Sequence, residues 1–306
     1  SAMAMSLERL LLPPDHGNIE LLSPPRQVNG RQKGFETSAA AEAEDCHRAH
    51  ALKAFRGSIP EELRPSAKDL KKRLSATGTP RTLASARHYR NLRIRIVGGL
   101  LALCERWPRR HLRTFCAIPK GWVVPADELD QVEPSKMIAQ FRAHLVRADA
   151  ATADGFLVAF LDAEFEPNSR TYIFHLHGFV GGGMISVVDS LRARPAFKRR
   201  ADCWVPLKLA PLKRNSERAE TFSYALKPFW KCRGVVRKDG EEKSRRQRLS
   251  TRIPEPDHIR SLLWKDRVSI GDLAILMKCK VTLRGLALTQ AALNQTYMTR
   301  KVTPPP

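Results

Sequence analysis

The spacing of apolar residues changes several times along the chain and divides it into segments of different type. Apolar side chains recur every three or four residues from Thr82 to Arg106, which predicts an amphipathic helix that ends before Pro108. Residues 1–80 contain repeated prolines that interrupt any long period. We therefore expect short helices and linkers, partly disordered, in this first region.

The middle of the chain alternates between runs typical of strands and runs typical of helices. The order is β-α-β-β-α-β-α, over residues 112–118, 135–147, 155–165, 171–180, 186–194, 202–212 and 216–227. The two adjacent strands are separated by the turn sequence Glu166-Pro167-Asn168-Ser169-Arg170, which predicts a β-hairpin. This order predicts an α+β fold with an antiparallel sheet of the ferredoxin-like, or split βαβ, type.

The last part of the chain is polar first and apolar afterwards. Residues 231–260 are rich in Lys and Arg and are interpreted as a loop or linker, whereas residues 261–299 return to helical spacing. Val268 to Leu288 is weakly similar to a helix-turn-helix, although Lys278 stands where a turn glycine is expected. A duplex-binding motif and an ordinary packed pair of helices are both compatible with this pattern.

The net charge of the chain indicates which chemical class of partner it binds. The chain has 53 Lys and Arg against 31 Asp and Glu, a formal net charge of +22. An excess of this size indicates a polyanionic partner, most often nucleic acid. No apolar run approaches the roughly 20 residues of a membrane-spanning helix, and the six cysteines form no CxxC pair. We expect a cytoplasmic protein without a membrane partner.

Two histidines, His175 and His177, lie in the second strand of the predicted hairpin. Alternate residues of a strand share a face, so both imidazoles project the same way. If Glu166 pairs with Thr171, Asp162 lies opposite His175, and Glu164 shares the same face. Two imidazoles and a carboxylate suit Mn²⁺ or Mg²⁺ with open water positions better than a closed zinc site. An ordinary strand without a metal is the alternative.

The segment before Pro228 has a second set of reactive groups. On a helix, Glu220, Tyr224 and Lys227 stand at positions i, i+4 and i+7 of one face. A phenol with its usual pKa of about 10 is a weak nucleophile, so it needs a target that a cation polarises. A packing tyrosine beside a lysine that extends to solvent is the simpler interpretation of the same spacing.

Together these motifs resemble the HUH endonucleases, and within them the replication initiators of rolling-circle plasmids and phages. In those proteins a His-hydrophobic-His strand precedes a helix that carries Tyr-x-x-Lys, as His175 and His177 precede Tyr224 here. Glu220 and Pro228 stand four residues either side of Tyr224, so the similarity is to members with a single tyrosine. It covers about residues 110–232, and the family's Thr-containing strand is matched only loosely by residues 113–118.

The resemblance implies a DNA-nicking and joining replication initiator. Its tyrosine would attack a phosphodiester of single-stranded DNA or an origin hairpin and form a 5′-phosphotyrosyl intermediate, with a host helicase or polymerase as protein partner. The implied site consists of His175, His177 and either Glu164 or Asp162 for Mg²⁺ or Mn²⁺, and of Tyr224, Lys227 and Glu220 for catalysis. A transposase of the same superfamily and a non-catalytic basic nucleic-acid-binding protein are the alternatives.

This interpretation divides the chain into four regions. They are a partly disordered or helical region at 1–80, a nuclease domain with its preceding basic helix at 81–232, a basic linker at 233–260 and a helical region at 261–306. Aromatic residues lie among the basic ones at Phe197, Trp204, Phe229 and Trp230. Such a mixture is typical of grooves that bind single strands, although core packing explains each aromatic residue equally well.

Overall fold

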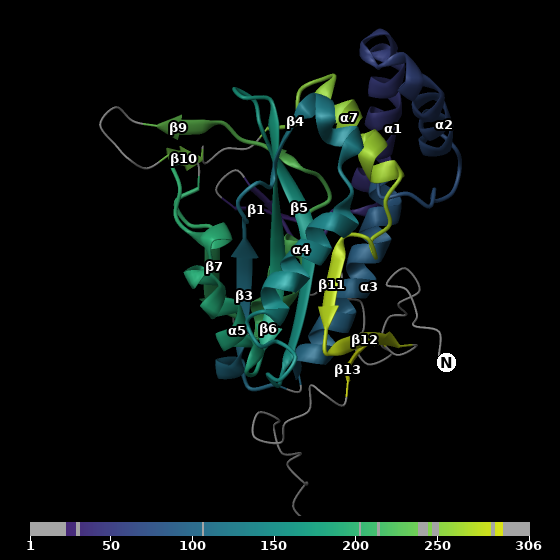
Figure 1. Ribbon diagram of the computed structural model, residues 1–306. Coiled ribbons are helices and arrows are strands. Elements are labelled where there is room, and N and C mark those ends of the chain that lie inside the picture. Colours follow the sequence, from purple (N-terminus) through teal and green to yellow (C-terminus); the bar gives the residue numbers. More distant parts are fainter. Residues whose placement is uncertain are drawn as a thin grey trace, which may run out of the picture.

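The centre of the molecule is an open β-sheet. The computed structural model describes residues 23–28, 31–105, 107–201, 203–212, 215–237, 244–246, 251–282 and 285–289. The strand order is β11-β5-β6-β3-β7, while β4 pairs with β6 and β8 with β5 (Figure 1). Only the short β5–β8 pair is parallel. The strands are β3 (Leu112–Ala117), β4 (Val123–Pro125), β5 (Phe156–Glu166), β6 (Thr171–Gly181), β7 (Leu207–Pro211), β8 (Lys231–Cys232) and β11 (Ala274–Met277).

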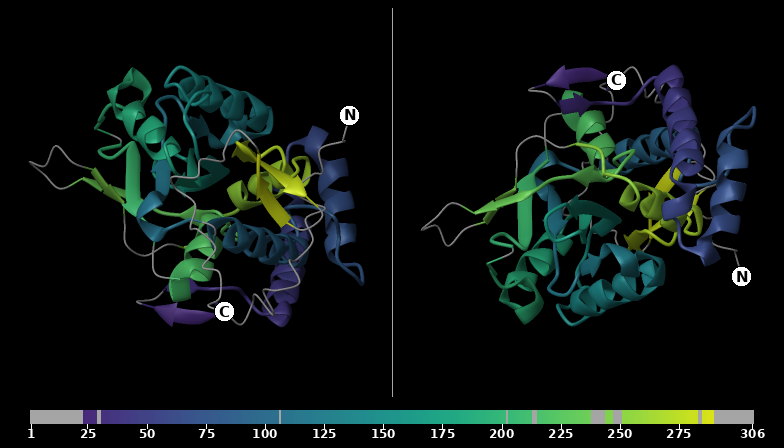
Figure 2. Two further views of the ribbon diagram at one scale, coloured as in Figure 1. Left: turned by 90° about the horizontal axis from the view of Figure 1, so that it is seen from below. Right: turned by 90° about the horizontal axis from the view of Figure 1, so that it is seen from above.

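Helices cover both faces of this sheet. Helices α4 (Pro134–Val146) and α5 (Met184–Ser190) lie on one side, and α3 (Ala86–Glu105) and α6 (Asn215–Ala225) on the other (Figure 2). Ring contacts anchor the two layers: Phe115 stacks on Phe141 of α4, whereas Phe179 meets Phe222 of α6. The connectivity β3-α4-β5-β6-α5-β7 is the predicted order, and the expectation of an α+β fold with a mostly antiparallel sheet is confirmed.

The β5–β6 hairpin forms in the predicted register. Glu166 pairs with Thr171, so Asp162 lies opposite His175. The Glu166 carboxylate accepts hydrogen bonds from the backbone N–H groups of Asn168 and Ser169, which fixes the turn. Because helices cover both faces, every residue of β5 is buried, acidic ones included. The carboxylates of this strand are therefore placed inside the protein and not at its surface.

In its described part, the N-terminal region contains two α-helices and a pair of short strands. Its elements are β1 (Arg26–Val28), β2 (Arg31–Lys33), α1 (Ser38–Ala54) and α2 (Arg64–Leu74). Helix α1 begins where Thr37 caps the N–H of Ala40, and it packs against α2 and α3. Buried Asp45 of α1 accepts a hydrogen bond from the backbone N–H of Ala86 and so caps the start of α3. The expectation for residues 1–22 lies outside the described residues.

The expected C-terminal helices are wrong for the described residues between α7 (Asp257–Asp266) and residue 289, and the expectation for 290–306 lies outside the described residues. Residues 268–288 form no helix-turn-helix, and strands β11, β12 (Cys279–Thr282) and β13 (Gly285–Leu288) take their place. The apolar run Ala274–Met277 pairs with the edge of β5, where it completes the sheet. Lys278 has a φ of 57°, which turns the chain between β11 and β12. A short apolar run fits a helix and a buried strand equally well, and only the vacant sheet edge decides between them.

The polar region that follows α6 also contains regular structure. Strands β9 (Val235–Arg237) and β10 (Ser244–Arg246) pair with each other inside the expected linker. Short 3₁₀ segments complete the fold at Arg56–Ser58, Glu61–Leu63, Arg109–His111, Ala126–Gln131, Leu191–Ala193 and Pro195–Phe197. Among the described residues, no helix combines the length and the apolar character that crossing a membrane requires.

Candidate metal centre and nucleophile

Three potential metal ligands converge on the face of the hairpin that α6 covers. Ligand atoms of Asp162, His175 and His177 all lie within 4.8 Å of one another. The two Nε2 atoms are 3.0 Å apart, and Asp162 Oδ2 lies 3.3 Å from His175 Nε2 and 3.8 Å from His177 Nε2. All three donor atoms therefore point at one small volume. The set could hold a metal ion, and its imidazole and carboxylate groups fit a divalent cation.

The backbone prepares one imidazole for such a role. His175 Nδ1 lies 3.1 Å from the carbonyl oxygen of Ile173, which can only accept, so Nδ1 donates to it and Nε2 is the nitrogen that faces Asp162 and His177. Burial, together with the charge of Lys227, holds the pKa of His177 well below its usual range. His177 is therefore neutral near pH 7. Metal binding to imidazole requires the neutral form.

Lys227 also points at this group. Its Nζ lies 2.7 Å from Asp162 Oδ2 and 3.6 Å from Glu164 Oε1, and its side chain is 4% exposed. Burial alone would raise the pKa of Asp162. The charges of Lys227 and His175 lower the pKa by more than burial raises it, so the carboxylate is ionised. Burial would likewise lower the pKa of Lys227, and Asp162 raises it. The two charges therefore compensate each other inside the protein.

Tyr224 lies beside the histidines. Its ring centroid is 5.8 Å from that of His177, and 45% of the residue is exposed. Buried Phe222 packs into the core, and Arg93 of α3 donates a hydrogen bond to the carbonyl of Ser223, so the end of α6 is held against the sheet. The phenol is the accessible group of this helix end. The predicted convergence of the His pair with Tyr224 is present in the structure.

Two ammonium groups flank the phenol. The Nζ atoms of Lys227 and Lys231 lie 5.3 Å and 5.6 Å from the Tyr224 ring centroid. Burial, with the charges of Lys227 and Arg233, lowers the pKa of Lys231 to about 8. Both lysines therefore bring positive charge close to the Tyr224 phenol, where it favours negatively charged groups.

The two other predicted acids occupy different positions. Glu164 is buried on the same face, but its carboxylate lies 3.6 Å from both Lys227 Nζ and Arg233 Nη1 and is not part of the three-ligand group. Asp162 is thus the better placed of the two candidate ligands. Glu220 is half-buried one turn before Tyr224 and lines the cavity that borders it.

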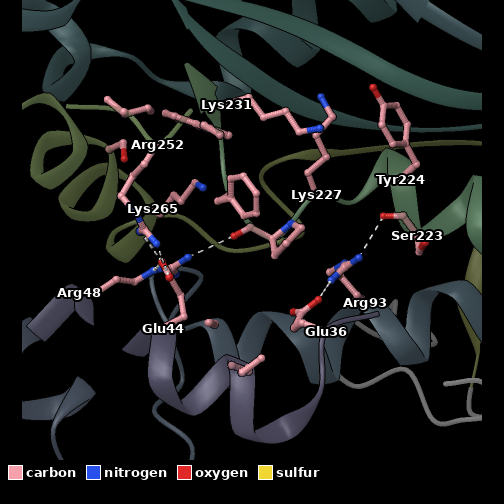
Figure 3. A pocket seen from close by; sticks show the side chains of 18 of the residues that line it. Glu36, Glu44, Arg48, Arg93, Ser223, Tyr224, Lys227, Lys231, Arg252 and Lys265 are labelled. Carbon is pink, nitrogen blue, oxygen red and sulfur yellow. Dashed lines mark hydrogen bonds and ion pairs between the residues drawn. The ribbon is translucent and has the colours of Figure 1, made fainter. Parts of the chain in front are cut away.

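A cavity of about 700 Å³ adjoins Tyr224, and the sequence did not indicate most of its lining (Figure 3). Arg48 of α1 and Lys265 of α7 line it together with Lys231 and Arg252. These residues are separated by up to 217 positions, and no motif links them. The one local signal is the i, i+4 spacing of Glu44 and Arg48, which form a buried ion pair at 2.8 Å.

The aromatic residues expected in a single-strand groove have different environments. Phe197 and Trp230 are 3% and 6% exposed and belong to the core. Trp204 is half-buried beneath the guanidinium of Arg199, 5.3 Å from its ring centroid. Phe229 is 38% exposed and lines the cavity. Of the four, Phe229 is the best placed to contact a ligand in the cavity beside Tyr224.

Comparison with known proteins adds no family assignment. No family model, curated protein or solved structure matches this chain. A function can therefore be argued only from the chemistry of the site itself.

Proposed function

We propose that this protein nicks and joins single-stranded DNA, using Tyr224 as the nucleophile. The observation that carries the proposal is the 5.8 Å separation between the rings of Tyr224 and His177, which puts an accessible phenol beside three convergent metal ligands. The net charge of +22 supports a polyanionic substrate. A replication initiator of the HUH type is the role that the motifs resemble most.

Each residue of the site has a role in this proposal. Asp162, His175 and His177 hold Mn²⁺ or Mg²⁺. Such an ion, when bound, polarises the phosphoryl oxygen and stabilises charge that develops on it. Lys227 and Lys231 stabilise negative charge on the phenol oxygen and on the phosphate. Tyr224 displaces the 3′ oxygen, so the enzyme retains the 5′ phosphate and releases a strand with a free 3′-hydroxyl.

Two further features support the proposal. The order β3-α4-β5-β6-α5-β7, with the histidines on a central strand, is the arrangement that the resemblance to HUH endonucleases implies. Glu220 lies one turn before Tyr224 and borders the same cavity, so it could activate water or the attacking hydroxyl of a second strand when the phosphotyrosine is resolved.

The test is a covalent adduct assay. The protein is incubated with Mn²⁺ and a random-sequence pool of single-stranded oligonucleotides, and adducts are detected by denaturing electrophoresis. We expect an adduct that disappears in Tyr224→Phe and is retained in the matched control Tyr172→Phe, whose phenol donates to the carbonyl of Asp257 and is not part of the cavity lining. His175→Ala and His177→Ala should abolish it as well.

The opposite outcome is equally clear. An adduct that persists in Tyr224→Phe would refute the assignment of the nucleophile. Absence of any adduct, combined with salt-sensitive DNA binding and no Mn²⁺ binding by the wild-type protein, would favour a non-catalytic nucleic-acid-binding protein.

A further inference from the structure

The cavity beside Tyr224 has walls from three separate parts of the chain. Helix α1 contributes Arg48, helix α7 contributes Lys265, and the segment after α6 contributes Phe229 and Lys231. In Figure 3, Tyr224, Lys227 and Lys231 lie along one side of it, Arg48 lies beside Glu44 on the opposite side, and Lys265 lies between Lys231 and Arg48. A volume of about 700 Å³ is within the range of small-molecule sites and admits a nucleotide.

Most positive side chains that line the cavity pair with acids, as Arg93 does with Glu36 and Lys227 with Asp162. Arg48 and Arg252 both pair with Glu44, at 2.8 Å and 2.6 Å, and this lowers the pKa of Glu44 to about 2 despite its burial. Lys231 and Lys265, by contrast, form no ion pair with an acid in the described ranges. The arginines therefore stabilise the wall, whereas the two lysines leave positive charge available for an anion.

Aromatic rings lie next to these lysines. Lys265 Nζ is 4.6 Å from the ring centroid of Trp230, which fixes the ammonium at the cavity wall. Phe229 lines the same cavity and keeps 38% of its surface exposed. Uncompensated ammonium groups next to an exposed aromatic ring are suited to a ligand with a phosphate and a planar base.

We propose that this cavity binds a single nucleotide of the DNA strand, next to the bond that Tyr224 attacks. Lys231 and Lys265 hold its phosphate, and Phe229 stacks on its base. The position relative to the cleaved bond rests on the proposed function, because Lys231 is also 5.6 Å from the Tyr224 ring. Nucleotide binding in the cavity does not depend on that chemistry.

The first experiment measures binding without cleavage. Fluorescein-labelled oligothymidylate is titrated against the full chain by anisotropy in EDTA, one pH unit below the value of about 7 to which burial and Arg48 lower the pKa of Lys265. We expect Lys265→Gln and Phe229→Ala each to weaken binding at least fivefold. Matched controls outside the cavity, Lys280→Gln and Phe55→Ala, should stay within twofold.

The outcomes separate this proposal from the nickase. Unchanged affinity in Lys265→Gln and Phe229→Ala would overturn the cavity proposal even if the adduct assay succeeds. Loss of affinity without any covalent adduct would leave the nucleotide site standing while Tyr224 chemistry fails. If Lys265→Gln weakens the binding of thymidine monophosphate but not that of oligothymidylate, the cavity binds a free nucleotide. The assignment of the cavity to a nucleotide of the strand is then wrong.

A second experiment locates the nucleotide. In strands that form an adduct, each base is removed in turn and the affinity of the Tyr224→Phe protein is measured. We expect one abasic position next to the cleaved bond to weaken binding, and Phe229→Ala to cancel that loss. An undiminished loss in the Phe229→Ala protein would overturn the stacking assignment.

Discussion

Lys227 Nζ lies 2.7 Å from Asp162 Oδ2, so an ammonium group occupies the neighbourhood in which the three candidate ligands would hold a metal ion. Two positive charges this close repel each other strongly in a buried site. A bound cation and Lys227 therefore compete for Asp162, and the lysine must either shift towards Tyr224 or weaken metal binding.

This competition predicts the effect of Lys227→Met on metal affinity. Removing the ammonium should tighten Mn²⁺ binding by about tenfold or more, because at least ~1.4 kcal/mol of repulsion is lost. Isothermal titration calorimetry measures it, with the exposed Lys136→Met as control. In the absence of metal, Lys227→Met should also have a lower melting temperature than the wild-type protein, since Asp162 then lacks its ammonium partner. Addition of Mn²⁺ should restore the melting temperature. Weaker Mn²⁺ binding in Lys227→Met would contradict competition.

Removing Arg48, whose ion pair with Glu44 is largely buried, should cost more stability than removing an arginine from an exposed ion pair. Its guanidinium is 1% exposed and donates to Glu44, to the carbonyl of Ala84 and to that of Pro228. Arg48→Met should lower the free energy of unfolding by about 1–3 kcal/mol, because the buried carbonyl of Ala84 loses its hydrogen-bond donor while Glu44 keeps Arg252. The exposed pair Arg192–Asp189 is the comparison, where Arg192→Met should cost less than about 1 kcal/mol. Urea unfolding that gives equal values would show that Arg48 does not anchor the segment after Tyr224.

Gly178 lies next to His177 at a point where the sheet leaves no room for a side chain. A Cβ there would overlap the ring of Phe115. Gly178→Ala should therefore destabilise the protein by about 1–3 kcal/mol. Gly57 has open space around it, so Gly57→Ala should change stability by less than about 0.5 kcal/mol. Thermal unfolding of both variants tests this contrast, and equal melting temperatures would refute it.

The lowered pKa of Lys265 should make the stability of the protein depend on pH. Burial and the charge of Arg48 lower its pKa from 10.5 to about 7 in the folded protein. Between these values the unfolded chain binds a proton that the folded protein has lost, so the free energy of unfolding should rise with pH, by at most about 1.4 kcal/mol per unit. Lys265→Met should flatten this rise between pH 7 and pH 10. Equal slopes in urea unfolding series of the two proteins would exclude the effect.

The hairpin and its site could be predicted because the information is local. The turn after Glu166 fixes the register, and a period of two then puts Asp162 and His175 face to face. Tyr224 needs only a helix that packs on the same face, and Phe222 supplies the apolar anchor for it. Short-range pattern and strand geometry therefore suffice for the candidate ligands and nucleophile.

The rest of the site depends on contacts between distant segments. Arg48 reaches the carbonyl of Pro228 across 180 positions, and nothing near either residue signals that contact. The strand at Ala274–Met277 was predicted as part of a helix because its apolar side chains satisfy both periods. Which structure forms is decided by tertiary packing against β5.

The pairing of β11 with β5 has a consequence for synthesis and for shortened versions of the chain. Strand β5 is made more than a hundred residues before β11, so its backbone N–H and C=O groups on that side stay unsatisfied until Ala274–Met277 has emerged and docked. A bare, entirely apolar edge of this kind recruits strands from neighbouring molecules. Fragments that stop before Ala274 should therefore self-associate, even though they keep Tyr224 and the three candidate metal ligands.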